Sequence, residues 1–161
     1  MAKKKKRNKF GVLQTPEGKI KRTSYDYITG EPILFSSELE KKYYDEVVVN
    51  GMKDGTITKY KLQQRYNLLK SFKYQGQTIR EINYISDFDI WYTDGSFKVI
   101  DTKGRATADA LIKAKLFKYN YPDIDFVWLS YTIATGWIEY HELQKIRRQK
   151  KKEKKAIKDG K

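Results

Sequence analysis

The pattern of apolar and polar positions predicts two neighbouring strands, each carrying an acidic residue where burial is expected. One is Ile85–Ile90 with Asp87, and the other is Val99–Gly104 with Asp101. Residues two apart on a strand point to the same face, so Lys103 shares a face with Asp101. Burying an unpaired charge is costly. These carboxylates are therefore expected to be paired with a cation.

The same pattern predicts the first half of the chain as a hairpin, a helix and strands. The hairpin covers Lys19–Phe35, and a helix opens at Ser36-Ser37 and ends at Asn50-Gly51 and Asp54-Gly55. Leu39, Tyr43 and Val47 would form its apolar stripe. The predicted strands that follow are Thr56–Gln63, with Tyr66–Tyr74 as its continuation, then Ile79–Tyr92 after a turn at Gly76, and Phe97–Thr102 after Asp94-Gly95.

The second half begins with a helix over Thr107–Tyr119, which Pro122 prevents from continuing. Ile124–Tyr131 is the most apolar run and is expected to be a central strand buried on both faces. A short segment at Trp137–Tyr140 precedes a basic C-terminal helix that we expect to fray. The order α-β-β-β-α-β predicts an α/β (α+β) fold with a mixed sheet flanked by helices.

Composition limits the chemistry that is available. The 161 residues suit one domain, and no cysteine is present, which excludes disulfides and thiolate metal sites. His141 is the single histidine, so any metal must be held by oxygen ligands, which favours Mg²⁺ or Mn²⁺ over Zn²⁺. No run is apolar enough for a membrane span and no signal peptide is evident. We expect a cytoplasmic protein that needs no membrane.

The positive charge lies at the two ends of the chain. Residues 1–9 carry six Lys or Arg and no acid, and residues 145–161 carry ten against two acids. These ends account for the net charge of +14, so residues 10–144 are formally neutral. Basic tails bind polyanions without reading sequence. We expect a flexible basic arm over 1–18, a single domain over 19–144, and a basic helix or tail over 145–161.

Asp87 and Asp101 can share a metal only if they face the same way. A two-residue loop at Asp94-Gly95 would place Asp87 opposite Thr102 and hence on the other face from Asp101. A shared site therefore requires an odd-length loop or a β-bulge. Asp89 lies on the same face as Asp87 and is the alternative ligand, or else a solvated acid at a strand edge.

Other polar residues have both a structural and a functional interpretation. Ser37-x-x-Glu40 fits a capping box, while a helix packed on the sheet would instead aim Glu40 at the metal. Gln63 is either an ordinary polar strand residue or a hydrogen-bond donor to a metal-bound water or a phosphate. His141 has no partner in sequence, so a catalytic role is not expected. Candidate phosphate contacts, or else solvated positions, are Arg105, Lys113, Lys115, Lys3, Lys4, Lys5, Lys6, Arg147 and Arg148. The chain has no nucleotide-binding glycine loop.

Four segments together resemble the PD-(D/E)xK nuclease superfamily. Phe35–Glu40 is similar to an F-x-S-x-L-E helix start, Tyr84–Phe88 to a Y-x-x-D-F strand, and Val99–Gly104 to V-x-(D/E)-x-K-G. Ile112–Phe117 with Tyr121-Pro122 resembles the following helix and its exit. The resemblance spans about residues 27–131 and is nearest to small phage endonucleases of the junction-resolving type. Ser86 stands where the superfamily has its nominal Pro.

The resemblance implies a restriction-endonuclease-like core and a Mg²⁺- or Mn²⁺-dependent DNA endonuclease. Asp87, Asp101 and the Thr102 carbonyl would bind one or two ions, with Glu40 as a further ligand. Lys103 would stabilise the attacking hydroxide and the phosphate charge. The expected setting is phage recombination or replication in a bacterial host. There, a homodimer would make two symmetric cuts in a Holliday junction or other branched DNA.

Two alternatives stay open. The chain could be a nicking or end-processing nuclease that works with a replication or packaging partner. It could also be a non-catalytic nucleic-acid-binding protein that uses its tails and its 13 tyrosines.

Overall fold

The computed structural model describes residues 22–159, with side chains up to Ile157. The chain divides into two compact units. Unit 1 contains the described residues up to Tyr60 together with Trp91–Ser96, and unit 2 contains Lys61–Ile90 and the residues from Phe97 onward. Lys3–Lys6, residues 19–21 of the predicted hairpin and the rest of the predicted N-terminal arm lie outside the described residues.

Unit 1 begins with the expected hairpin. Strands β1 (Thr23–Tyr25) and β2 (Pro32–Leu34) are antiparallel, with Ser24 opposite Ile33. The Asp26 carboxylate closes the connecting loop by accepting the backbone N–H groups of Ile28 and Thr29 at 3.0 and 2.8 Å. Carboxylates commonly stabilise turns in this way, which is why Asp is frequent there.

The helix of unit 1 contains a π-helical segment. Helix α2 (Glu38–Tyr43) passes through the five-residue π segment η1 (Tyr44–Val48) into α3 (Val49–Asp54). The expected stripe of Leu39, Tyr43 and Val47 is only partly correct, because the most buried side chains of this stretch are Tyr43, Tyr44 and Val48 with Glu40. A π segment adds a residue to the turn and shifts the buried face, which a regular 3.6-residue period does not foresee.

The predicted helix end at Asn50-Gly51 is wrong, and the one at Asp54-Gly55 is confirmed. Gly51 lies inside α3 and is buried, whereas Gly55 follows the helix in the left-handed conformation with φ of 79°. A Cβ added to Gly51 would lie 2.6 Å from Ile57 Cδ1 and 2.7 Å from Ile57 Cγ1. Gly51 is therefore explained by the close approach of the Ile57 side chain rather than by a turn.

The main sheet has five strands in the order β11-β10-β9-β8-β3. Strand β9 (Phe97–Thr102) is parallel to β10 (Asp125–Thr132), which is antiparallel to β11 (Gly136–Glu139), so the sheet is mixed as expected. The other two strands are β3 (Ile57–Leu62) and β8 (Phe88–Tyr92). The middle strand is β9, with four consecutive buried residues. The expectation that Ile124–Tyr131 is central and buried on both faces is wrong, since only Phe126 and Ser130 of β10 are buried.

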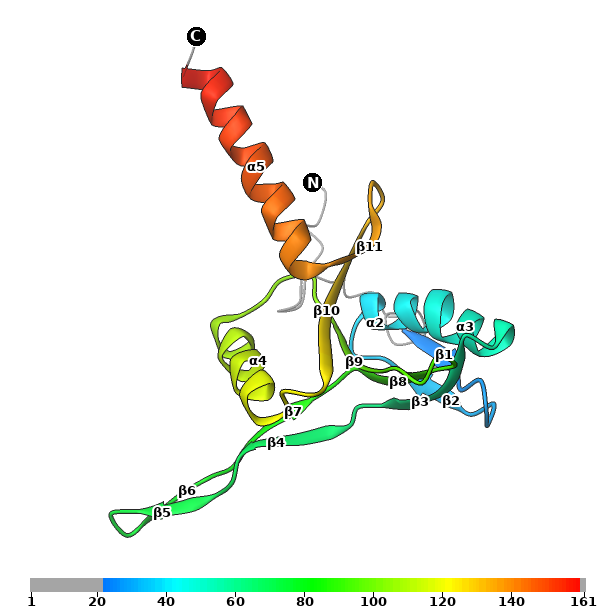
Figure 1. Cartoon of the computed structure of the whole chain (residues 1–161), viewed down its shortest axis with the longest axis vertical. Coiled ribbons are helices and arrows are strands. Elements are labelled where there is room, and N and C mark those ends of the chain that lie inside the picture. The colour runs from blue at the N-terminus through cyan, green and yellow to red at the C-terminus, as the bar shows by residue number, and fades with distance from the viewer. Residues whose placement is uncertain (1–21, 160–161) are drawn as a thin grey trace, which may run out of the picture. The chain divides into compact units, whose positions relative to one another are not determined.

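The chain between β3 and β8 forms two ribbons that the sequence pattern did not separate. Strand β4 (Arg65–Leu69) pairs with β7 (Ile82–Ile85), and β5 (Phe72–Tyr74) pairs with β6 (Gln77–Ile79). The predicted strand Ile79–Tyr92 is therefore three strands. The turn at Gly76 is confirmed, because Gly76 has φ of 78° between β5 and β6. Within unit 2, Figure 1 shows β5 and β6 extending from the β4–β7 pair, away from α4.

An odd-length loop joins β8 to β9. Tyr92 donates its N–H to the Ser96 carbonyl at 2.9 Å, and Gly95 donates its N–H to the Tyr92 carbonyl at 3.1 Å. Three residues therefore form the loop, with Gly95 left-handed at φ of 83°. This is the usual three-residue hairpin closed by a glycine. Counting back along the two strands from Tyr92 and Ser96 places Asp87 level with Asp101, as a shared site requires.

Helix α4 (Ala108–Asn120) begins where the sequence predicts, with Thr107 Oγ1 accepting the Ala110 N–H at 3.2 Å. It packs on β4 and β7 through an aromatic core. Phe117, which is fully buried, has its ring centroid 4.4 Å from that of Phe126, 4.9 Å from Tyr66 and 5.5 Å from Tyr84. Such edge-to-face and stacked ring pairs add to the favourable free energy of burial.

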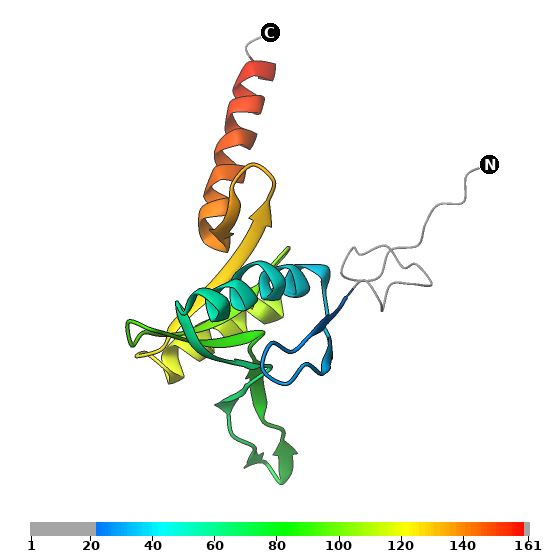
Figure 2. The same cartoon turned by 90° about the vertical axis from the view of Figure 1, so that its right-hand side faces the viewer.

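The C-terminal helix α5 (Tyr140–Asp159) follows β11 directly. Leu143 is buried and anchors its first turn, while residues 145–157 are exposed. Figures 1 and 2 show most of α5 extending beyond the β10–β11 hairpin of its own unit. No helix between residues 22 and 159 combines the length and apolarity needed to cross a lipid bilayer.

We expect Gly51→Ala to destabilise the protein by about 1–3 kcal/mol. Helix propensity alone would favour Ala by roughly 1 kcal/mol, but the added methyl group overpacks against the buried Ile57 side chain. Urea unfolding at neutral pH measures the difference. The exposed Lys53→Ala in the same helix is the control and should change stability by less than about 0.5 kcal/mol. A stabilised Gly51→Ala would contradict the packing explanation.

Candidate active site

Asp101 is the centre of the candidate site. It lies on the central strand β9 with only 2% of its surface exposed. Its Oδ2 accepts a hydrogen bond from the Tyr84 hydroxyl at 2.7 Å and forms an ion pair with Lys103 Nζ. The expected partnership of Asp101 and Lys103 on one strand face is therefore present. The paired ammonium and the hydroxyl offset the cost of burying this carboxylate.

Lys103 is positioned from both sides by β10. Its N–H donates to the Leu129 carbonyl at 2.7 Å, and its carbonyl accepts the Ser130 hydroxyl. Its Nζ lies 5.6 Å from the centre of the Trp128 ring, within the range of a cation–π interaction. The backbone of Lys103 is thus fixed while about a quarter of its side chain remains accessible.

Asp87 lies beside the same end of β9 but not within a strand. It occupies the bend between β7 and β8, which corrects the expectation of a strand-borne residue at this position. The bend is fixed by two backbone bonds, from Gln63 N–H to the Asp87 carbonyl at 3.3 Å and from Ser86 N–H to the Gln64 carbonyl at 3.0 Å. Asp87 Oδ2 accepts both the N–H and the hydroxyl of Thr102, at 2.7 and 2.9 Å. Asp87 therefore bonds the residue that follows Asp101.

Asp89 is the buried acid of β8, with 3% of its surface exposed. Its carboxylate accepts the hydroxyls of Tyr66 and Ser86, the latter at 2.7 Å. Burial raises the pKa of Asp89, and these two hydrogen bonds together with the charge of Lys61 offset part of the increase. Asp89 is therefore enclosed by its own partners, and the expectation of a solvated strand-edge acid is wrong.

Two tyrosines that the sequence reasoning missed support the two buried acids. Tyr66 and Tyr84 are directly opposite each other in the β4–β7 pair, and each donates its hydroxyl to a different aspartate. Tyr84 also accepts the Trp128 indole N–H at 3.0 Å. Burial and the neighbouring charge of Asp101 raise the pKa of Tyr84, so it remains a protonated donor. The only sequence signal was the position of Tyr84 within the Y-x-x-D-F segment.

Glu40 belongs to unit 1 and makes the contacts of a helix cap. Ser37 Oγ accepts the Glu40 N–H at 3.1 Å, and Glu40 Oε2 accepts the Ser36 N–H at 3.1 Å. The capping interpretation is confirmed at this helix start. A role of Glu40 as a metal ligand stays a prediction. Gln63 holds the bend at Asp87 through its backbone N–H, as described above. Its backbone is left-handed, with φ of 51°, and its side chain is exposed.

The remaining candidate residues are mostly exposed to solvent. Lys113 pairs with Asp109 at 3.6 Å on α4, and His141 is exposed between Glu139 and Glu142 at 3.0 Å from each. Their side chains are thus already paired. Exposed cations that remain candidates for phosphate contact are Arg105, Lys115, Arg147 and Arg148.

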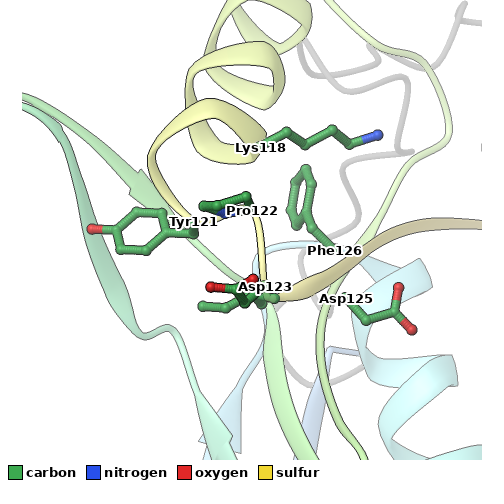
Figure 3. Close-up of a pocket in the computed structure, with 7 residues that line it drawn as sticks. Lys118, Tyr121, Pro122, Asp123, Asp125 and Phe126 are labelled. Carbon is green, nitrogen blue, oxygen red and sulfur yellow. The ribbon is translucent and has the colours of Figure 1, made fainter.

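A pocket of about 480 Å³ lies at the other end of the β9–β10 pair from Asp101. It is formed where α4 leads into β10, and Figure 3 shows Lys118 of α4 beside the ring of Phe126. None of its lining residues contacts the carboxylate cluster in the interactions described above. We therefore place the candidate chemistry at Asp101 rather than in this pocket.

The donors at Asp101 suit a hard cation. Asp87, Asp101 and the Thr102 carbonyl offer oxygen atoms only, and Mg²⁺ needs one or two carboxylates together with water and substrate phosphates. In the part of the chain that the structure describes, no group of three or more His, Cys, Asp or Glu residues is placed to hold a metal. Oxygen donors such as those of Asp87, Asp101 and Thr102 are the kind that Mg²⁺ and Mn²⁺ take in proteins.

Residues 20–135 match the model of the family described as "Protein of unknown function (DUF1064)". The chain belongs to this family. The region shared with the DUF1064 family contains both units' candidate residues, from Glu40 to Lys103, and ends before α5. No curated protein matches the chain. The description of the DUF1064 family assigns no function, so function is argued below from the geometry.

We expect Asp89→Asn to become relatively more stabilising as pH rises. A carboxyl group with a raised folded-state pKa favours folding below its unfolded pKa of about 4 and loses that contribution as pH rises through the folded pKa. Asn stays neutral throughout. Urea unfolding of both proteins at pH 4, 5.5 and 7 measures the change. Asp123→Asn, at an exposed position, is the control. A difference that does not vary with pH would show that Asp89 ionises normally in the folded protein.

Proposed function

We propose that the chain is a Mg²⁺- or Mn²⁺-dependent endonuclease that hydrolyses phosphodiester bonds in DNA. The observation that carries the proposal is the cluster at the end of β9, where the buried Asp101 is paired with Lys103 and Asp87 bonds Thr102. Two acids that can hold a divalent cation, with a lysine beside them, suit metal-assisted hydrolysis of a phosphodiester bond. The resemblance of four sequence segments to PD-(D/E)xK nucleases agrees with this assignment.

Each residue has a distinct task under the proposal. Asp87, Asp101 and the Thr102 carbonyl would hold the cation, which would supply Lewis-acid stabilisation and a lowered pKa for a bound water. Tyr84 orients Asp101 from the core side. The Lys103 ammonium, about a quarter exposed, would stabilise the negative charge that develops on the phosphate oxygens. Water adds to phosphorus as the bond to the 3′-oxygen breaks, leaving a 5′-phosphate and a 3′-hydroxyl.

Lys103 would have a second role under this proposal. In the structure it neutralises Asp101 directly. A divalent cation bound at the same carboxylate would take over that charge balance and allow the ammonium to interact with the substrate phosphate instead. Lys103 would thus stabilise the buried acid without the metal and the scissile phosphate with it.

The choice of DNA rests on charge and on the resemblance. The exposed cations of α5 provide a polyanion-binding surface beyond the neutral middle of the chain. A preference for branched DNA, a homodimer with two sites, and a cytoplasmic setting in a phage-infected host belong to the same proposal. A non-catalytic binding protein is the competing outcome. What favours the enzyme over it is that Asp101 and Asp87 lie together at the end of β9 beside the partly exposed Lys103.

We expect Asp101→Asn to lose cleavage while it retains DNA binding. The amide keeps the shape of the side chain but removes the charge that would hold the cation, so the rate should fall at least about 100-fold. A labelled four-way junction, linear duplex and single strand would each be incubated with Mg²⁺ or with EDTA. Asp123→Asn is the control for a surface acid.

Each result of this assay has a definite meaning. Cutting that requires Mg²⁺ and is lost only in Asp101→Asn supports the proposal, and a junction cut symmetrically supports the resolvase assignment. Equal cutting of all three DNAs keeps the nuclease and removes the junction preference. Binding without cutting under Mg²⁺ and Mn²⁺ contradicts the enzyme and favours the binding protein.

We expect Tyr84→Phe to raise the Mg²⁺ concentration for half-maximal cleavage by about 10–100-fold. Loss of the hydroxyl that orients a metal-ligating carboxylate typically has this effect. The directly opposite Tyr66→Phe is a matched control, because it removes the same group from Asp89 instead. A shift in Tyr66→Phe alone would identify Asp89, rather than Asp101, as the ligand. Urea unfolding would show that both variants lose similar stability.

A further inference from the structure

We propose that the β5–β6 ribbon is a binding site for unpaired DNA bases. This inference rests on the proposed function, because it names the part of a DNA substrate that the ribbon would hold. The ribbon consists of Phe72–Tyr74 and Gln77–Ile79 joined by the turn at Gln75-Gly76. It shares no residue with the carboxylate cluster or with the basic tails.

The two faces of the ribbon differ in chemistry. The register pairs Phe72 with Ile79 and Tyr74 with Gln77, and residues two apart share a face. One face therefore carries both aromatic rings next to Ile79. The opposite face carries Lys73, which donates to the hydroxyl of its cross-strand partner Thr78 at 2.5 Å.

The aromatic face is left open to solvent. Phe72 is 44% exposed and Tyr74 is 59% exposed, and all but one of the residues in the two strands are exposed. A short two-stranded ribbon is marginally stable on its own, and exposed apolar side chains on it invite association. Such a surface is typical of one that a ligand covers.

Charge indicates what that ligand is. From Leu69 to Arg80 the chain has no acid. The exposed Lys70 and Arg80 flank the two strands in sequence, while Lys73 lies on the face opposite the rings. The next acid, Glu81, is engaged at the base of the ribbon, where Asn67 and Asn83 donate to its carboxylate at 3.3 and 2.8 Å. Aromatic rings flanked by cations are the elements that bind single-stranded nucleic acid, with bases stacked on the rings and phosphates on the cations. A second copy of this chain, also strongly basic, is a poorer match.

The ribbon is joined to the candidate site by its own strands. Strand β6 leads into β7, where Tyr84 donates to Asp101. The extended chain from Ile79 to Tyr84 spans at most roughly 17 Å at about 3.3 Å per residue. The ribbon and the candidate site are therefore parts of one continuous stretch of chain in unit 2, so that one DNA strand would be able to contact both.

The test measures binding without cleavage. The full chain in EDTA would be titrated into fluorescein-labelled oligo-dT single strand and into a matched duplex, with anisotropy as the readout. For Phe72→Ala/Tyr74→Ala we expect single-strand affinity to fall at least about tenfold, with little change for the duplex. Phe72→Leu/Tyr74→Leu keeps large apolar side chains on the ribbon but removes the rings. We expect this variant to lose as much single-strand affinity as the alanine variant, which would show that stacking on the rings, and not unfolding of the ribbon, is what was lost.

The matched control lies on α4 of the same unit. Leu111→Ala/Tyr119→Ala removes two exposed apolar side chains, 48% and 83% exposed, and should leave both affinities unchanged. Unchanged single-strand binding by the ribbon variants would overturn the inference, as would an equal loss for duplex. A ribbon variant whose only change is dissociation of a dimer in sedimentation would also overturn it, in favour of self-association. Because no metal is present, these outcomes do not depend on cleavage, and failure of the endonuclease proposal would be seen separately in the Mg²⁺ assay.

Discussion

The arrangement of unit 2 depends on how one buried negative charge is accommodated. Asp101 lies on the innermost strand of the sheet and cannot reach bulk water. Its partners come from three sources: Lys103 from the same strand end, Tyr84 from β7, and through Tyr84 the indole of Trp128 on β10. Removing any one of them would leave the carboxylate less compensated in a medium where charges interact strongly. Asp101 therefore links three parts of unit 2: the β4–β7 pair, the end of β9 and strand β10.

The same two tyrosine side chains belong to both the aromatic core and the group of buried acids. Tyr66 and Tyr84 pack their rings against Phe117, while their hydroxyls reach Asp89 and Asp101. Packing of the rings limits where the hydroxyls can lie, since protein interiors are densely packed. The hydroxyl donors are thus held beside the carboxylates by the packing of their rings on α4. A cavity in this core would be expected to displace the donors of Asp89 and Asp101 as well as to lower the stability of the protein.

Local signals in the sequence were sufficient for some elements and not for others. Thr107 as a cap, the alternation along Phe97–Lys103 and the pairing of Asp101 with Lys103 follow from patterns a few residues long. The division of Ile79–Tyr92 into three strands had no such signal, because Arg80-Glu81 and Ser86-Asp87 contain no glycine or proline. Gly51 gave a misleading signal for a helix end. Glycine stands there because the Ile57 side chain approaches closely, not because the backbone turns. Tyr66 and Tyr84 could not be assigned, because their roles arise from cross-strand register, which only the folded chain specifies.

The contact between Tyr140 and Ala106 joins the start of α5 to the segment that leaves the candidate site. The Tyr140 hydroxyl accepts the Ala106 N–H at 3.0 Å, just beyond Lys103 and Gly104, and its ring packs on Trp128. The first turn of α5 thus holds the segment that follows Lys103 against Trp128. If the exposed cations of α5 bind DNA as proposed, the helix that contacts the polyanion also fixes the backbone next to the lysine and the indole that surround Asp101.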